Sequence, residues 1–135
     1  MLIDGLKIEA PPEWLFRSMG QMILAERDSG VGCLQISLAF RHDLSGTESA
    51  ERCLALAREF VSCGGMSEPF DFTESADDGS FFGGFSYTVG EQFGRAWYRL
   101  ARGQLVLGSY GCAQQKKQAS ELSECECIMR SAQFA

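Results

Sequence analysis

Alternating apolar and polar positions predict strands in the N-terminal third of the chain. Residues 5–9 alternate in this way, and Pro11 and Pro12 should end the strand because proline cannot donate a hydrogen bond to a neighbouring strand. Two longer strands are predicted at residues 21–28 and 31–40, with a tight turn at Ser29 and Gly30 between them. In the second strand, every other residue is large and apolar: Leu34, Ile36, Leu38 and Phe40. We therefore expect that face to lie in the core.

A change to helical periodicity marks the next element, a helix from about Thr47 to Cys63. Its apolar residues form one stripe: Ala50, Cys53, Leu54, Ala57, Phe60 and Val61. Ser45 or Thr47 can cap its first N–H groups, and the glycine pair after Cys63 can end it. We expect the helix to pack on the preceding strand, with one buried set formed by Leu34, Ile36, Leu38, Leu54, Phe60 and Val61.

The C-terminal half predicts four further strands and a second helix. They are a strand around Phe70 and Phe72, strands at residues 80–89, 93–101 and 104–112, and a helix over residues 115–131. An acidic turn over residues 75–79 follows the first of these strands, and Arg102-Gly103 predicts a hairpin. Gly83-Gly84 marks a bulge or a close approach of the backbone. The narrow apolar seam of the helix consists of Leu122, Cys125, Met129 and Ala132.

Short connections between adjacent strands predict hairpins, and a sheet built from hairpins is mostly antiparallel. We therefore expect an α+β fold, with a mostly antiparallel central sheet of about six or seven strands and two main helices packed on it. The 135 residues contain no repeat, no low-complexity tract and no linker. Residues 1–135 are therefore predicted to form a single domain.

Composition and charge narrow the classes of function. Hydrophobic residues make up 45% of the chain and charged residues 22%, as in ordinary globular proteins. A net charge of -6 argues against nucleic acid as a partner, since phosphate binding depends on clustered Lys and Arg. No apolar run approaches the ~18 residues of a membrane span, and the N-terminus lacks the features of a signal peptide. These patterns favour a cytoplasmic protein that binds neither nucleic acid nor membrane.

Cysteine and histidine occur in patterns that favour structural roles. In a cytoplasmic protein of this size the six cysteines are predicted to be free thiols: Cys33, Cys53, Cys63, Cys112, Cys125 and Cys127. Cys125 and Cys127 would lie about 200° apart around a helix, so both sulfurs cannot bind one ion. His42 is the single histidine and is expected in an exposed loop. The sequence therefore predicts no metal site, and it has no local signature of a Cys–His pair.

Glycine-rich loops and paired carboxylates give no catalytic signal either. None of the fifteen glycines forms the G-x-G-x-x-G or G-x-x-x-x-G-K-[ST] pattern that holds phosphates. Asp77 and Asp78 are adjacent, but in a solvated turn they gain little of the desolvation that tunes a catalytic pKa. We therefore expect a protein that is not an enzyme and has no cofactor.

The distribution of charge along the chain is more informative than its sum. Residues 59–94 hold seven acidic residues and no Lys or Arg, whereas residues 95–120 hold five basic residues and no acid. Six of the ten phenylalanines fall between Phe70 and Phe93. Either cross-strand pairs with the basic strands neutralise the acids, or the acids form a rim around an aromatic core that binds a basic protein. In the second interpretation the contact residues are Asp71, Glu74, Asp77, Asp78, Phe81, Phe82 and Phe85.

Four short motifs accompany this order of elements: Pro12-Glu13-Trp14, Trp97-Tyr98-Arg99-Leu100, Gly103-Gln104-Leu105 and Ser131-Ala132-Gln133-Phe134. Together they resemble the Mog1/PsbP-like group, which includes small bacterial domains of unknown function. The resemblance implies a sandwich of a central antiparallel sheet with helices on its faces and, typically, a binding role. It carries no catalytic residues. Some bacterial immunity proteins, which neutralise toxins of secretion systems, are similar in size, charge and lack of a site.

Two hypotheses for function follow from these patterns. The leading one is a non-enzymatic protein-binding domain, such as an immunity or accessory protein of a bacterial toxin or secretion system, whose partner is a basic protein. The alternative is a small-molecule-binding domain with a cavity between sheet and helix. The residues that would line this cavity are Trp14, Trp97, Tyr98 and Tyr110.

Overall fold

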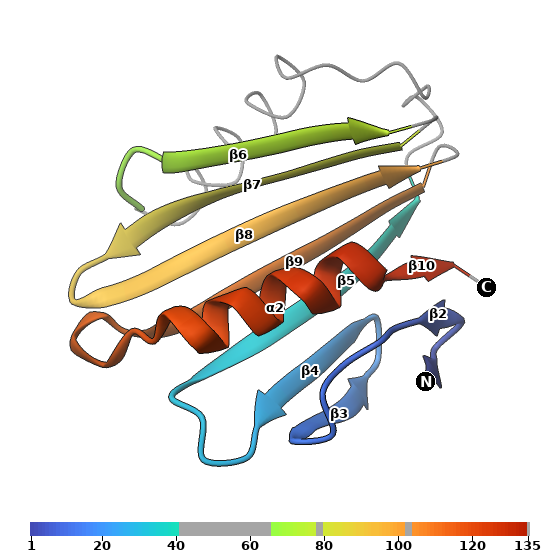
Figure 1. Ribbon diagram of the computed structural model, residues 1–135, viewed down its shortest axis with the longest axis horizontal. Coiled ribbons are helices and arrows are strands. Elements are labelled where there is room, and N and C mark those ends of the chain that lie inside the picture. Colours follow the sequence, from blue (N-terminus) through green and yellow to red (C-terminus); the bar gives the residue numbers. More distant parts are fainter. Residues whose placement is uncertain (41–65, 78–79, 102–103, 135) are drawn as a thin grey trace.

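The computed structural model describes residues 1–40, 66–77, 80–101 and 104–134 (Figure 1). Its strands are β1 (Leu2–Ile3), β2 (Leu6–Lys7), β3 (Trp14–Met19), β4 (Met22–Arg27), β5 (Gly32–Phe40), β6 (Phe70–Asp77), β7 (Ser80–Val89), β8 (Gln92–Ala101), β9 (Gln104–Ala113) and β10 (Gln133–Phe134). Its helices are a short 3-10 helix, η1 (Gln114–Lys116), and the α-helix α2 (Ala119–Ser131).

Seven strands of the described chain form one sheet in which every neighbouring pair is antiparallel. The order is β3-β4-β5-β9-β8-β7-β6, which is two meanders joined where β5 pairs with β9. Hairpin turns produce the local order. Met19 pairs with Met22 across a two-residue turn, and Gly20 in that turn has a φ of 74°, which glycine adopts without strain. The predicted antiparallel sheet of six or seven strands is confirmed.

The N-terminal strands differ from those predicted. Residues 5–9 do not join the large sheet, because Leu6–Lys7 (β2) lies between β1 and β10 in a separate three-stranded sheet. No strand was predicted at Trp14–Met19, yet β3 is the seventh strand of the large sheet. It is an edge strand whose side chains are mostly exposed, and such a strand has only a weak apolar pattern in the sequence.

Of the two predicted helices, one lies in the described part of the chain. The segment from Thr47 to Cys63, with Leu54, Phe60 and Val61, lies outside the described residues. The C-terminal helix, α2, begins at Ala119 rather than at Gln115, because η1 precedes it. This later start keeps Lys116 and Lys117 out of the first turn, where the helix dipole disfavours positive charge. The residues described contain one main helix, and no helix among them is long and apolar enough to cross a membrane.

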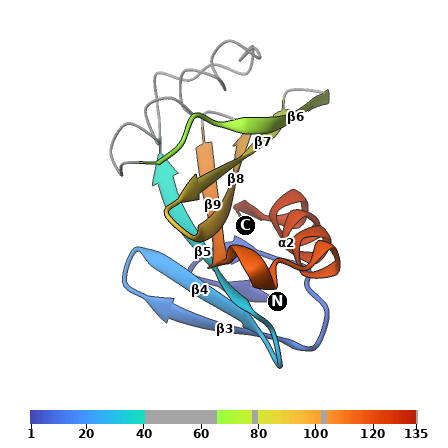
Figure 2. The same cartoon turned by 90° about the vertical axis from the view of Figure 1, so that its left-hand side faces the viewer.

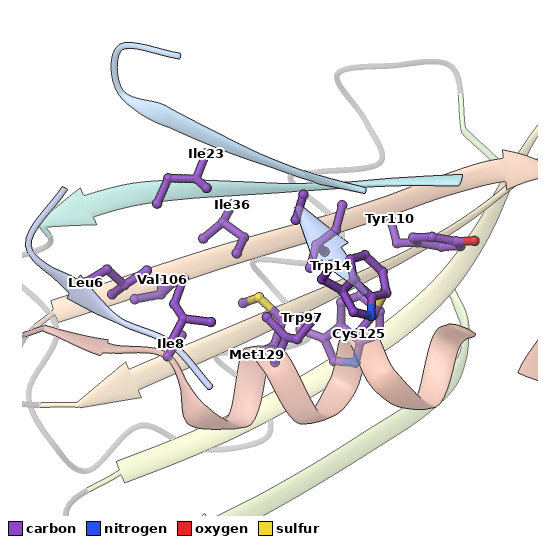
Figure 3. Packing of buried hydrophobic residues seen from close by; sticks show 14 of the residues in the cluster. Leu6, Ile8, Trp14, Ile23, Ile36, Trp97, Val106, Tyr110, Cys125 and Met129 are labelled. Carbon is purple, nitrogen blue, oxygen red and sulfur yellow. The ribbon is translucent and has the colours of Figure 1, made fainter. Parts of the chain in front are cut away.

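The larger core lies between α2 and the face of the sheet that the helix covers (Figures 1, 2 and 3). The predicted helix seam is confirmed, since Cys125, Met129 and Ala132 are buried and Leu122 packs against them, with Ile128 as a further buried member. The residues that oppose the helix include Leu34, Ile36, Trp97, Val106 and Tyr110. Leu34 and Ile36 are fully buried, as predicted, in the core cluster that includes residues of α2. Their predicted packing with Leu54, Phe60 and Val61 falls outside the described residues, as does the side chain of Leu38.

Two glycines make room for Trp97 and the helix. Gly84 and Gly108 pair with Trp97 from either side, on β7 and β9. A Cβ atom at Gly84 would lie 2.8 Å from Cδ1 of Trp97, and one at Gly108 would overlap Sδ of Met129. Pairing is continuous through Gly83 and Gly84. Of the two expectations for this glycine pair, the close approach is therefore confirmed.

A second buried cluster covers the opposite face of the sheet. It consists of Phe81, Phe85, Tyr87, Ala96, Tyr98, Leu100 and Leu105. Phe85 is the central ring of the cluster: it stacks on Tyr98 with 5.8 Å between the ring centroids, and it packs at a tilt against Tyr87 with 6.0 Å between the centroids. Met66 packs against the cluster from the segment that leads into β6. Both faces of the central strands are therefore apolar.

Candidate interaction surface

β6 is the last strand of the described sheet, and its side chains are exposed along most of its length. Each residue from 70 to 76 is exposed. An edge strand has one side on which its N–H and C=O groups lack a neighbouring strand, so it can pair with an extended segment of another chain. The candidate interaction surface therefore includes the outer edge of β6.

A bulge in β6 gives the surface its shape. The register of β6 against β7 shifts between Phe70 and Thr73, and Asp71 has a φ of 54°. A bulge bends an edge strand and re-aims its side chains. Aspartate tolerates the left-handed backbone conformation better than most residues do. The local conformation of Asp71 therefore suits the bulge.

The buried side chain of Arg95 holds the bulge in place from the inside of the sheet. Its Nη1 atom donates to the carbonyl oxygen of Asp71 at 2.9 Å and to Oγ of Ser86 at 2.8 Å, and its Nη2 atom donates to Oγ1 of Thr73 at 2.9 Å. Burial lowers the pKa of Arg95, while the nearby carboxylates of Glu126 and Asp71 raise it. The arginine thus crosses β7 and binds the backbone and a side chain of β6.

Two phenylalanines of β6 are only half-covered. Phe70 and Phe72 remain 40% and 46% exposed. Phe72 stacks on Phe85 with 6.0 Å between the ring centroids. Phe85 is fully buried and packed against Tyr98, so it is a rigid support for the exposed ring. The edge strand therefore presents apolar area that its own fold does not cover.

Exposed carboxylates flank these rings. Asp71 and Glu74 are both exposed, and neither is in an ion pair with another described residue. The basic strand β8 is not a neighbour of β6, since β7 lies between them. Arg95 does reach β6, but it binds the carbonyl of Asp71 rather than the carboxylate. Within the described chain neither Asp71 nor Glu74 therefore forms a cross-strand ion pair, although Arg95 lies near enough to interact electrostatically with the Asp71 carboxylate. The side chain of Asp77 and the whole of Asp78 lie outside the description.

The expectation that Phe81, Phe82 and Phe85 form an exposed contact surface is wrong. Phe81 and Phe85 belong to the buried cluster on one face, and Phe82 is buried on the other. The reason is their position on β7, an interior strand whose two faces are both covered. The residues near them also form strand rather than a turn, because Ala76 pairs with Phe81 and Asp77 with Ser80. The exposed rings belong to β6.

Three of the four residues proposed to line a ligand cavity fill the space between sheet and helix. Trp14, Trp97 and Tyr110 are buried together beneath α2 (Figure 3). Each donates a hydrogen bond to a helix glutamate: Trp14 Nε1 to Glu124 at 2.8 Å, Trp97 Nε1 to Glu126 at 3.4 Å, and the Tyr110 hydroxyl to Glu121. These rings are core residues whose polar atoms are already bonded, as buried Trp and Tyr require.

Tyr98, the fourth of these residues, lies on the opposite face of the sheet. There it lines a pocket of about 290 Å3 together with Met66, Tyr87 and Leu107. Burial raises the pKa of the Tyr87 hydroxyl, and a hydrogen bond to Ser109 partly offsets this. The pocket is at the lower end of the size range of small-molecule sites. The four residues therefore do not line one cavity.

The described cysteines do not form a metal site. Cys33, Cys112, Cys125 and Cys127 are free thiols, and Cys125 is buried where Cys127 is exposed, as the helical geometry predicted. No three His, Cys, Asp or Glu side chains of the described part are placed to hold one ion. The remaining cysteines, Cys53 and Cys63, and the single histidine, His42, lie outside the description.

Replacing Arg95 by methionine tests whether this residue holds the edge strand. Methionine keeps much of the apolar stem and removes three hydrogen-bond donations, so we expect a loss of about 1–3 kcal/mol in the free energy of unfolding. The amides of residues 71–75 should exchange faster in hydrogen-exchange experiments. The matched control is Arg17→Met, which removes an exposed ion pair to Glu26 and should change neither quantity. Unchanged exchange in β6 would show that the bulge does not depend on Arg95.

Sequence reasoning missed the exposed rings, the arginine and the helix glutamates for different reasons. Phe70 and Phe72 were placed on a strand, but nothing local identifies that strand as an edge. Arg95 stands in the apolar run Phe93-Gly94-Arg95-Ala96-Trp97, and a lone arginine in an interior strand is a signal for a buried polar partner. The partners themselves are set by strand order, which the local pattern does not contain.

Comparison with known proteins identifies the fold. No protein-family model matches the chain, and no curated protein matches it in sequence. Among solved structures, the chain is similar to the solution structure of cyanobacterial PsbP (CyanoP) from Synechocystis sp. PCC 6803. The TM-score is 0.64 at 13% identity, over 98% of this chain and 94% of that one. The chain therefore has the PsbP-like fold that its motifs resemble, and at this identity the likeness concerns the fold alone.

Proposed function

We propose that the chain is a non-enzymatic protein-binding domain that binds a basic polypeptide along β6. The observation that carries the proposal is the combination found on this one strand. Its outer backbone edge has no strand beside it in the described sheet, Phe70 and Phe72 are half-exposed, and Asp71 and Glu74 are exposed carboxylates without ion-pair partners in the described chain.

Each part of this combination has a separate role in the proposed binding. The backbone edge pairs with an extended segment of the partner, as in other complexes formed by strand addition. Phe72 is the anchor, because large aromatic side chains at the centre of an interface contribute most of the binding free energy. The carboxylates attract a basic partner and raise the rate of association. The rigid support of Phe72 by Phe85 reduces the entropy lost when the ring is covered.

The small-molecule alternative has less support, because the cavity on which it depended is filled. Trp14, Trp97 and Tyr110 occupy the space between sheet and helix and use their polar atoms within the protein. A role as a toxin-immunity protein is a narrower form of the main proposal. The features of β6 fit any basic protein with an extended segment.

A site-specific photocrosslinker tests which edge of the sheet binds the partner. Benzoylphenylalanine is placed at Phe72 in one protein and, as the matched control, at Leu15 of the other edge strand, where the native side chain is 67% exposed. We expect a specific crosslinked protein from the position of Phe72 and none from that of Leu15. Mass spectrometry identifies that protein, which is then purified. Equal crosslinking at the two positions would contradict the proposal.

Binding kinetics with the purified partner test the separate roles. Combined Asp71→Lys and Glu74→Lys substitutions should slow association about tenfold or more at low salt and weaken its salt dependence. Phe72→Ala should instead speed dissociation about tenfold or more. The control, Glu13→Lys with Glu91→Lys, makes the same change in net charge at exposed positions of other segments. An equal effect of this control on association would assign the steering to net charge rather than to β6.

A further inference from the structure

A second pocket, of about 500 Å3, lies between the strands β6, β7 and β8 and the last turn of α2. Its lining residues are Ser75, Ala76, Ser80, Phe82, Arg99 and Arg130. Ser75, Phe82 and Arg99 are directly opposite one another on three adjacent strands, so their side chains share the face that α2 covers. Arg130 comes from the helix. The topology thus brings two arginines and two serines, from four elements, to one hollow.

Arg130 is held over the pocket by three contacts. Its guanidinium lies 4.3 Å from the centroid of the Phe82 ring, and its Nη1 atom donates to Oγ of Ser75 at 3.3 Å. Its Nε atom is 3.6 Å from Oε2 of Glu126, one turn earlier on the helix. These contacts orient the guanidinium but leave the Nη2 donors without a partner among the described residues.

Arg99 is the less satisfied of the two arginines. Its Nε atom is buried and has no hydrogen-bond partner in the described chain. A buried donor without an acceptor costs about 1–3 kcal/mol, and native proteins rarely leave one without a reason. Burial lowers the pKa of Arg99, and the charge of Arg130 lowers it further. The two guanidinium groups are therefore close enough to repel each other, and Glu126 forms an ion pair with Arg130.

We propose that this pocket binds a phosphate group, held between Arg99 and Arg130 with Ser75 and Ser80 as additional hydrogen-bond donors. A phosphate dianion supplies the acceptor that Nε of Arg99 lacks and offsets the repulsion between the two guanidinium groups. A guanidinium group can donate two parallel hydrogen bonds to two oxygens of one phosphate, which makes such contacts strong. Two positive charges favour a dianion over a singly charged carboxylate. The pocket shares the strand β6 with the proposed partner surface, but phosphate binding needs no partner and is tested on the chain alone.

Titration with inorganic phosphate, followed by calorimetry and by the melting temperature, tests the proposal directly. Saturable binding is expected, with a rise in the melting temperature that follows the occupancy of the site. Because the chain carries a net charge of -6, general attraction of anions does not account for such binding. Sodium acetate and chloride at matched ionic strength should not saturate the site. Equal binding of acetate would overturn the phosphate assignment.

Glycerol phosphate, titrated in parallel, distinguishes the two sources of the group. Tighter binding of the ester than of inorganic phosphate identifies a phosphate monoester as the ligand, and the reverse order identifies the free ion. The site is supported if both ligands bind saturably and if substitution of Arg99 or Arg130 weakens their binding. Failure of both to bind overturns it.

Substitution of each arginine by methionine tests the assignment of residues. Arg99→Met and Arg130→Met should each weaken phosphate binding about tenfold or more. In phosphate-free buffer Arg99→Met should not lower the melting temperature, because it removes an unpaired buried donor and one of two like charges. The matched control Arg17→Met, far along the chain on β3, should bind phosphate as the unchanged protein does. Unaltered phosphate binding by both pocket variants would overturn the proposal, as would loss of stability by Arg99→Met without loss of binding.

Discussion

Replacing Glu121 by alanine should destabilise the protein by about 3–5 kcal/mol. This carboxylate is fully buried in the first turn of α2 and accepts hydrogen bonds from three groups outside the helix. The backbone N–H groups of Val31 and Gly32 donate to it at 3.2 Å and 3.0 Å, and so does the hydroxyl of Tyr110. Alanine would leave two backbone donors and a hydroxyl buried without an acceptor.

Chemical unfolding in urea measures this loss, since the midpoint shifts while the slope stays constant when only stability changes. Glu121→Gln is the first control. It keeps one oxygen for Gly32 and Tyr110, so its cost should be clearly smaller. Glu124→Ala is the second, because it removes a partly exposed partner of Trp14 and Arg27 and should cost about 1 kcal/mol. A loss below about 1 kcal/mol for Glu121→Ala would show that water replaces the carboxylate.

The contact between Glu121 and the turn at residues 29 and 30 could not be predicted from the sequence. Residues 29 and 30 predicted a turn, and the turn is present, with Gly30 N–H bonded to the carbonyl of Arg27 at 2.9 Å. What the local pattern does not contain is that a glutamate 90 positions later binds this turn. A Cβ atom at Gly30 would lie 2.7 Å from Oε1 of Glu121. The glycine therefore serves a long-range contact as well as a local bend.

Most strands were predictable because hydrophobic alternation and turn residues act locally. β5, β7, β8 and β9 begin and end within about two residues of the predicted limits, since β-branched and aromatic residues alternate between clear turn signals. β3 was missed, and the separate small sheet that contains Leu6–Lys7 was not predicted, because edge strands and very short strands are held by pairing rather than by a strong apolar face. Strand order, with β5 beside β9, is a long-range property that periodicity does not encode.

The candidate surface was only half predictable for the same reason. The acidic residues Asp71 and Glu74 were identified correctly as exposed, because charge clustering is visible in the sequence. The aromatic part was placed on Phe81, Phe82 and Phe85, which are buried, although Phe72 on the neighbouring strand has the required exposure. Both segments combine aromatic residues with small or polar ones. Only the strand order distinguishes the interior strand β7 from the edge strand β6.

Two buried groups beside Glu121 make stability depend on pH in the alkaline range. Burial raises the pKa of Tyr110, and its hydrogen bond to the Glu121 carboxylate raises it further. Burial also raises the pKa of the Cys125 thiol, with the charges of Glu121 and Glu124 acting in the same direction. Both side chains are fully buried. Because these pKa values are higher in the folded than in the unfolded chain, the unfolded chain loses its protons first as pH rises.

The protein should therefore be about 4–5 kcal/mol less stable at pH 11 than at pH 7. The stabilisation by neutral Cys125 and Tyr110 is complete below their ordinary pKa values of about 8.5 and 10. Above its ordinary pKa, the contribution of each group to the free energy of unfolding falls by about 1.4 kcal/mol per pH unit. Urea unfolding at a series of pH values, with reductant present, measures the curve. Tyr110→Phe should flatten only the part above about pH 10, whereas Cys125→Ala should flatten it from about pH 8.5. A stability that stays constant to pH 10.5 would contradict the burial of both groups, since exposed thiols and phenols titrate equally in the folded and unfolded chain.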